Sequence, residues 1–141
     1  MVRLGDRVRV RSIDLGGQPD SIAVSPDGAF AAIAIESQRA EDGDLPQPPT
    51  GFVRLLALDG APEQWTPRRV EFDVEQARAA GLDTPEDLEP EYVAINDRGQ
   101  VAVTLQENNG VAVIDGRSGE VSRIFSAGNA AVAGIDTADE G

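Results

Sequence analysis

Residues 89–119, EPEYVAINDRGQVAVTLQENNGVAVIDGRSG, carry the clearest signal for the fold of this chain. It contains three short apolar segments, and each ends in a turn signal: NDRG, ENNG or DGRSG. Segments rich in Val, Ile, Ala and Thr between such turns are typical of antiparallel strands joined by tight hairpins. Acidic and amide side chains gather at one end of these segments. The stretch therefore predicts a β-meander with a polar rim.

The same pattern occurs earlier in the chain. Residues 18–37, QPDSIAVSPDGAFAAIAIES, align with residues 89–108 at a constant offset of 71, and LALDG (56–60) aligns with AVIDG (112–116). The pairs matched in this way include Gly28 with Gly99, Ala31 with Ala102, and Glu36 with Glu107. Repeats of about 40 residues with four short strands each are typical of β-propeller blades.

We therefore predict an all-β fold, a partial β-propeller of about two four-stranded blades with flanking strands and one short helical insertion. One domain is expected over 1–141, with blade-like repeats at about 18–74 and 89–126 and a linker with a short helix at 73–88. Asp73 is the expected N-cap of that helix and Gly81 its end, and 84–87 is expected to form one more helical turn. The predicted strands are 7–15, 21–25, 30–35, 52–58, 69–74, 92–96, 100–106, 110–115 and 120–125.

The number of blades bears on how the chain works. A propeller closes with roughly 4–8 blades, so two blades suggest a fragment of a larger protein, or a module that self-associates through its open blade edges. A β-sandwich is the alternative fold, and the internal repeat argues against it. The sequence does not establish the blade number of a parent protein, the oligomeric state, or whether this chain folds alone.

Composition excludes several classes of function. Twelve basic residues, all Arg, stand against 25 acidic ones, for a net charge of −13, which disfavours nucleic acids and anionic membranes as partners. With no Cys, His or Lys, the chain has no Ser-His-Asp triad, no Walker loop and no usual zinc ligands, and neither haem nor a nucleotide cofactor is expected. No apolar run has the length of a membrane span, and no signal peptide is predicted in this chain.

Several motifs resemble a known family. The resemblance rests on IAVSPDG (22–28), AIES (34–37) followed by DGDLPQPP (42–49), LEPEYVAIN (88–96), VTLQENNGVAVID (103–115) and FSAG (125–128). Together they are similar to the extracellular propeller family called esterase-like activity of phytase and to related bacterial surface propellers. The resemblance implies phosphate-ester or phytate-type hydrolysis, and a parent protein that is extracytoplasmic, either periplasmic or secreted.

Antiparallel pairing also predicts a candidate site. The start of a blade's first strand and the end of its second lie at the same end of the sheet. That arrangement gathers five carboxylates as metal ligands: Asp20, Glu36, Glu89, Glu91 and Glu107. Gln106, Asn108 and Asn109 lie beside them as candidate substrate-binding residues, with Arg98 or Arg39 as possible phosphate partners. An all-oxygen set of ligands suits Ca²⁺ or Mg²⁺, which could hold phosphate oxygens and polarise water.

The same residues also have a structural interpretation. Acids beside Pro at strand entries often cap turns, and Asn-Gly is a common hairpin signal. The run Glu41–Asp44 is only a weak calcium-loop signal, because it lacks the alternating ligands of an EF-hand. No nucleophile or general base can be assigned, so whether the chain is an enzyme stays open.

Two functions remain for comparison with the structure. One is a fragment of a phytase-like or esterase-like propeller that hydrolyses a small phosphate ester with an oxygen-bound divalent cation. The alternative is a non-catalytic β-propeller binding or scaffold module of a secreted or cell-envelope protein.

Overall fold

The computed structural model describes residues 1–36, 50–130 and 133–134, and it is all-β apart from one α-helix and one 3-10 turn. The predicted fold class is confirmed. The elements are β1 (Val2–Arg3), β2 (Val8–Arg9), β3 (Gln18–Val24), β4 (Phe30–Glu36), β5 (Phe52–Ala57), η1 (Pro62–Gln64), β6 (Pro67–Val70), α1 (Val74–Ala79), β7 (Pro90–Ile95), β8 (Gln100–Leu105), β9 (Gly110–Asp115) and β10 (Val121–Ser126).

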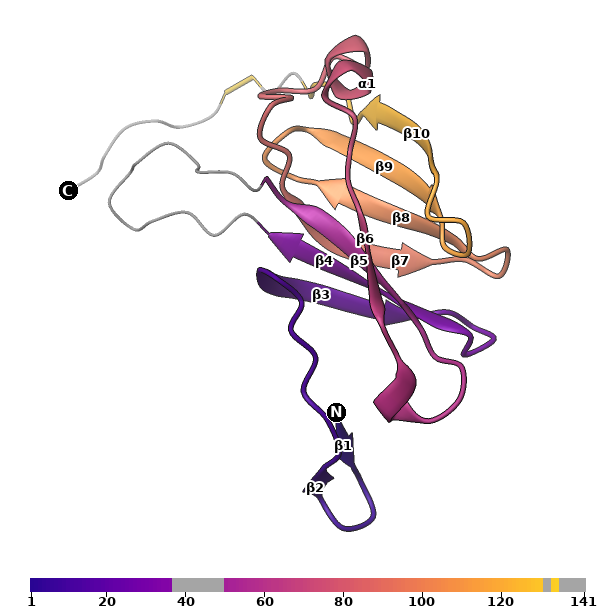
Figure 1. The fold of residues 1–141 in the computed structure, drawn as a ribbon. Coiled ribbons are helices and arrows are strands. Elements are labelled where there is room, and N and C mark those ends of the chain that lie inside the picture. Colours follow the sequence, from indigo (N-terminus) through magenta and orange to yellow (C-terminus); the bar gives the residue numbers. More distant parts are fainter. Residues whose placement is uncertain (37–49, 131–132, 135–141) are drawn as a thin grey trace, which may run out of the picture.

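Eight of the strands form two four-stranded antiparallel sheets. The first sheet has the order β3-β4-β5-β6 and the second β7-β8-β9-β10, so each is a meander of strands consecutive in sequence. The short β1–β2 hairpin forms a separate sheet that projects away from the other two (Figure 1). Strands that pair with their sequence neighbours are the arrangement expected of a propeller blade.

The two sheets stack through opposite faces. We call face A of the first sheet the side that carries Phe30, Ala32 and Ala34 on β4, and face B the side that carries Ala31, Ile33 and Ile35. Face A packs against the side of the second sheet that carries Val101, Val103 and Leu105 on β8, and these residues share one buried cluster. The first strands of the two sheets also meet, where the backbone N–H of Val93 donates to Ser21 Oγ at 2.9 Å.

The strand pairing shows that β4 and β8 match at an offset one residue smaller than the offset of 71 in the sequence alignment. Four residues separate the hydrogen-bonded pair Ser25 and Phe30 in the first hairpin, whereas three separate Asn96 and Gln100 in the second. As a result β4 and β8 correspond at an offset of 70: Ala23 pairs with Ala32, and Ala94 pairs with Ala102. Ala31 therefore corresponds to Val101, and Glu36 to Gln106. The Val101 side of the second sheet is accordingly its face B.

The N-terminal segment covers face B of the first sheet. Leu15 packs against Ile33, Ile35 and Phe52, and Arg54 Nε donates to the carbonyl of Leu15 at 2.9 Å. A Cβ on Gly17 would lie 2.4 Å from Ile35 Cγ2, so only glycine lets the backbone approach the sheet this closely. The prediction of a strand over 7–15 was wrong beyond Val8–Arg9, because the residues that follow make other contacts: the Arg11 side chain donates to the carbonyl of Trp65 at 2.7 Å, and Leu15 packs on face B.

The linker between the sheets begins with the predicted helix. Asp73 accepts hydrogen bonds from the N–H groups of Glu75 and Gln76, and Ala77 is buried against the core. At 84–87, where one more helical turn was expected, the chain makes a single turn in which the Asp87 N–H donates to the Thr84 carbonyl at 2.9 Å, and no helix is assigned there. Thr84, the expected N-cap of that turn, has a φ of 43°, in the left-handed region. Within the described residues, no helix has the length and hydropathy needed to span a bilayer.

Candidate functional site

Five carboxylates lie at one end of the two sheets, and we call this set the acidic rim: Asp20, Glu36, Glu89, Glu91 and Glu107. Asp20 and Glu91 stand near the starts of β3 and β7, while Glu36 ends β4 and Glu107 follows β8. Antiparallel pairing brings these strand ends together, as the sequence predicted. Gln18, which pairs with Glu36, donates from Nε2 to Glu36 Oε2 at 3.2 Å.

The acidic rim is electrostatically coupled at Glu91. Partial burial raises the pKa of this carboxyl, and the negative charges of Asp20, Glu107, Glu36 and Glu89 raise it further, in that order. All four of the other rim acids are therefore near enough to repel a charge on Glu91. A proton on Glu91 or a cation beside it would relieve that repulsion.

The residues of the acidic rim do not form a ready-made cation cage. In the part of the chain that the structure describes, no three carboxyl side chains meet in an arrangement that could hold a metal ion. Asp20 and Glu107 are exposed, Glu36 and Glu91 are half-buried, and Glu89 is 3% exposed. Binding of Ca²⁺ or Mg²⁺ to this set stays a prediction.

Asn108 has a structural environment. Its side chain is completely buried, and Oδ1 accepts a hydrogen bond from the backbone N–H of Glu89 at 2.8 Å. Nδ2 lies 2.8–3.2 Å from the carbonyl oxygens of Asp83, Thr84 and Asp87. One side chain thus fastens the linker that precedes β7 to the turn that follows β8. A substrate would reach this amide only by displacing those contacts.

The two neighbours of Asn108 differ from it. Asn109 has a φ of 52° in the β8–β9 turn, and its Nδ2 donates to the carbonyl of Gly128 at 2.9 Å, which ties the turn to the segment after β10. Gln106 is exposed at the acidic rim and occupies the position that Glu36 has in the first sheet. The rim therefore repeats less regularly than the sequence alignment suggested.

Arg98, one of the two arginines considered as phosphate partners, lies away from the acidic rim. Arg98 lies in the hairpin between β7 and β8, at the opposite end of the sheet, where its N–H donates to Asn96 Oδ1. Arg39 and the run Glu41–Asp44 lie outside the described residues.

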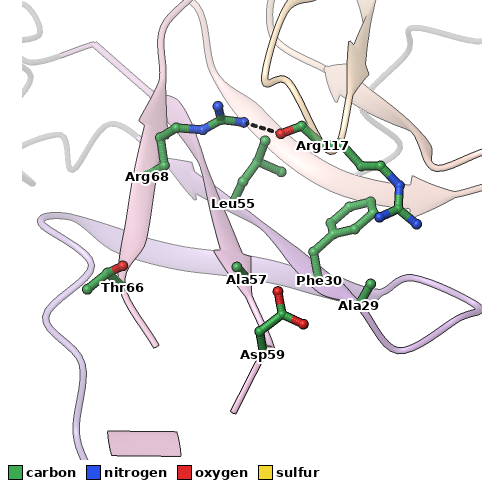
Figure 2. Close-up of a pocket in the computed structure, with 9 residues that line it drawn as sticks. Ala29, Phe30, Leu55, Ala57, Asp59, Thr66, Arg68 and Arg117 are labelled. Atoms are coloured by element: carbon green, nitrogen blue, oxygen red, sulfur yellow. Dashed lines mark hydrogen bonds between the residues drawn. The ribbon is translucent and has the colours of Figure 1, made fainter. Parts of the chain in front are cut away.

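Sequence reasoning missed a cavity at the end of the sheets opposite the acidic rim. It has a volume of about 400 Å³, and its lining includes Phe30, Leu55, Asp59, Arg68 and Arg117 (Figure 2). Arg68 reaches from β6 to the second sheet and donates to the carbonyls of Ser118 and Arg117 at 2.6 and 3.2 Å. Arg117 pairs with Asp27 at 2.5 Å. These contacts bridge the two sheets, and no local motif in the sequence signals them because the partners lie far apart in the chain.

The comparison with known families gives one match. The family model described as "Choice-of-anchor I domain", a bacterial surface-associated domain, matches residues 4–141. The chain belongs to the choice-of-anchor I domain family. Searches of curated proteins and of solved structures give no match.

Membership of the choice-of-anchor I family revises the relationship that the motifs suggested. The relation to bacterial surface proteins holds, whereas the comparisons give no support to a phytase or esterase relationship. A cell-surface or extracytoplasmic setting agrees with the family that matches.

Proposed function

We propose that this chain is a non-catalytic scaffold module of a secreted or cell-envelope protein. It belongs to a surface-associated domain family, and its two sheets stack as neighbouring blades. In this role the chain supplies a rigid segment of a larger β-structure. Chemistry on a substrate forms no part of the proposed role.

The environment of Asn108 is the single observation that supports this proposal best. Asn108 lies at the centre of the QENN motif that suggested substrate binding, yet its amide holds the linker at Asp83, Thr84 and Asp87. A buried polar network that is fully satisfied makes the local structure rigid and costs much to open. That arrangement suits a framework better than a substrate-binding group, which has to exchange partners on each turnover.

An assay for phosphate-ester hydrolysis tests the proposal. The purified chain is incubated with p-nitrophenyl phosphate and, separately, with phytate, each in the presence of Ca²⁺ or of chelator. A Ca²⁺ concentration of about 5 mM fills a hard-cation site of ordinary affinity. The expected result is release of product at the rate of the buffer alone. Release that depends on Ca²⁺ and is lost in Glu107→Gln, but kept in Glu120→Gln outside the acidic rim, would overturn the scaffold role.

Cation binding at the acidic rim is a second candidate function, favoured by the raised pKa of Glu91. Four neighbouring carboxylates repel the charge on Glu91, and a shared divalent cation offsets such repulsion. In this proposal Ca²⁺, or Mg²⁺, stabilises the contact between the two sheets, and a positive result in the assay above would add phosphate-ester hydrolysis to this role.

Thermal unfolding with and without Ca²⁺ tests this second candidate. A ligand that binds only the folded state raises its stability in proportion to the logarithm of ligand concentration. We expect the circular-dichroism midpoint to rise with Ca²⁺ and to return on addition of chelator, with no response in Glu107→Gln. An equal response in Glu107→Gln and in the wild-type chain would place any bound Ca²⁺ elsewhere.

A further inference from the structure

Face A of the second sheet is open, and it is largely apolar. Ala94, Ala102 and Phe125 are exposed, and Thr104, Val111 and Val113 are half-buried. Residues that pair across the strands lie on one side of the sheet, so these side chains form two continuous rows: Ala94–Ala102–Val113–Arg123 and Thr104–Val111–Phe125. The exposed Arg123 ends the first row at the edge strand, and its guanidinium carbon lies 5.5 Å from the centre of the Phe125 ring. A hollow of about 290 Å³ lies over the first row.

The equivalent face of the first sheet is closed. Ala32 and Ala34 occupy the positions of Ala102 and Thr104, and they are completely buried against the second sheet. The same kind of surface is therefore covered in one sheet and open in the other. The sheet that covers it lays down a row of branched aliphatic residues on its second strand: Val101, Val103 and Leu105.

The side chains of the two faces follow a size rule. Face A carries small residues towards the rim end of the second strand, Ala32 and Ala34 in one sheet and Ala102 and Thr104 in the other. Face B carries large ones at the adjacent positions, Ile33 and Ile35 in the first sheet and Val103 and Leu105 in the second. Small side chains opposite large ones let two sheets approach at the packing density of a protein interior.

We propose that face A of the second sheet is the docking surface for a further four-stranded antiparallel blade. The face B of that blade carries branched aliphatic residues on its second strand and packs on Ala102 and Val113. The docking continues the interface between the two sheets described above. It extends the scaffold function and rests on it.

A second copy of this chain does not provide that occupant as it stands. Its two faces B are already covered, one by the N-terminal segment through Leu15 and the other by face A of its own first sheet. Two copies whose second strands meet through the open faces A would oppose Ala102 and Thr104 to the same small residues and leave gaps between those strands. The occupant is therefore a blade whose face B is free.

A single-cysteine experiment tests this, because the chain has no cysteine of its own. Three full-chain variants each provide one thiol: Ala102→Cys on the open face, Ala32→Cys at the equivalent buried position, and Leu4→Cys at a site that is 90% exposed. The rate of alkylation by a neutral maleimide follows the exposure of the thiol. We expect Ala102→Cys to react within about threefold of Leu4→Cys, and Ala32→Cys at least about tenfold more slowly. A slow reaction at Ala102→Cys would show that the chain covers this face itself, and would overturn the proposal.

The occupant is then supplied as an extension. A second copy of residues 18–130 follows Gly141, so that the first sheet of the copy has no N-terminal segment over its face B. In this extended chain we expect the original Ala102→Cys to react about tenfold more slowly than without the extension, with the Leu4→Cys rate unchanged. Adding Val113→Arg to the original half should restore the fast reaction, while the melting midpoint of the unextended Val113→Arg chain stays at the wild-type value.

Each result decides the matter. An unchanged Ala102→Cys rate, in an extended chain whose circular-dichroism signal per residue equals that of the unextended chain, would overturn the proposal, because the appended copy is then folded and still does not cover face A. The readout is thiol protection and involves no turnover. A positive phosphate-ester assay would therefore contradict the scaffold function without changing this result, and failed docking would leave the outcome of that assay standing.

Discussion

Asn108 Oδ1 accepts a hydrogen bond of 2.8 Å from the backbone N–H of Glu89, which lies 19 residues earlier in the chain. This bond joins the entrance of β7 to the exit of β8, and the Nδ2 group of the same side chain holds the linker. Asn108 in the QENN motif thus connects the linker before β7 to the turn after β8.

Replacing Asn108 with Ala should therefore be strongly destabilising. The change leaves a buried N–H and several carbonyl oxygens without their partner, and we expect the free energy of unfolding to fall by about 2–4 kcal/mol. Urea denaturation followed by circular dichroism measures this fall. Gln106→Ala, at an exposed position two residues away, is the matched control and should change stability by less than about 0.5 kcal/mol. Equal effects of the two substitutions would contradict the role given to Asn108.

Glu91→Gln should stabilise the chain at neutral pH. The pKa of Glu91 is raised by burial and by the neighbouring acids, so between the ordinary value of 4.5 and the raised value the folded state binds a proton that the unfolded state releases. The contribution of Glu91 to stability is therefore present below that window and declines as the pH rises through it.

Melting curves at pH 7 and below pH 4 measure this difference. We expect Glu91→Gln to melt at a higher temperature than the wild-type chain at pH 7, and the gap to close at the lower pH, where both side chains are uncharged. Glu120→Gln, at an exposed site outside the acidic rim, should show no such pH-dependent gain. A lower midpoint for Glu91→Gln at pH 7 would mean that the charged carboxylate is stabilised in the fold.

Gly116→Ala tests the contact between the two sheets at the cavity end. A Cβ at this position would lie 2.1 Å from Cζ of Phe30 and 2.8 Å from the carbonyl oxygen of Gly99, so the sheets must move apart. Overpacking of this kind costs about 1–3 kcal/mol. Gly5→Ala is the matched control, because nothing lies within 4 Å of the added atom. An unfolding midpoint of Gly116→Ala equal to that of Gly5→Ala would argue against the packing of Phe30 on the second sheet.

Arg68 and Arg117 should contribute unequally to the stability of the contact between the two sheets. Arg68 donates to two backbone carbonyls across the sheets, whereas Arg117 forms an exposed ion pair with Asp27, and exposed pairs are largely screened by water and salt. Arg68→Ala is expected to lower the free energy of unfolding by about 1–2 kcal/mol, and Arg117→Ala to leave the urea midpoint close to the wild-type value. Both measurements are repeated at about 1 M NaCl, where the screening length falls to about 3 Å. The loss of stability caused by Arg68→Ala should remain largely unchanged. The opposite ranking of the two variants would refute this assignment.

Local chemistry determined much of this protein in advance. Short apolar segments between Gly- and Asn-containing turns were enough to predict eight strands in two consecutive meanders, and Asp73 with Gly81 was enough to place the helix. Antiparallel order alone brought Asp20, Glu36, Glu91 and Glu107 to one end of the sheets, because the second strand of a hairpin ends where the first strand began.

Three features follow from how the two sheets meet in space: which face each side chain occupies, the roles of the amides, and the contacts across the sheets. One additional residue in the first hairpin shifts β4 by one position, and in a strand a one-residue shift moves every side chain to the opposite face. An alignment of similar letters does not show such a shift. The same holds for Asn108 and Arg68, whose partners lie 19–25 and 49–50 residues away. Local sequence sets strands and turns, whereas burial and hydrogen bonding between distant segments depend on how the sheets meet.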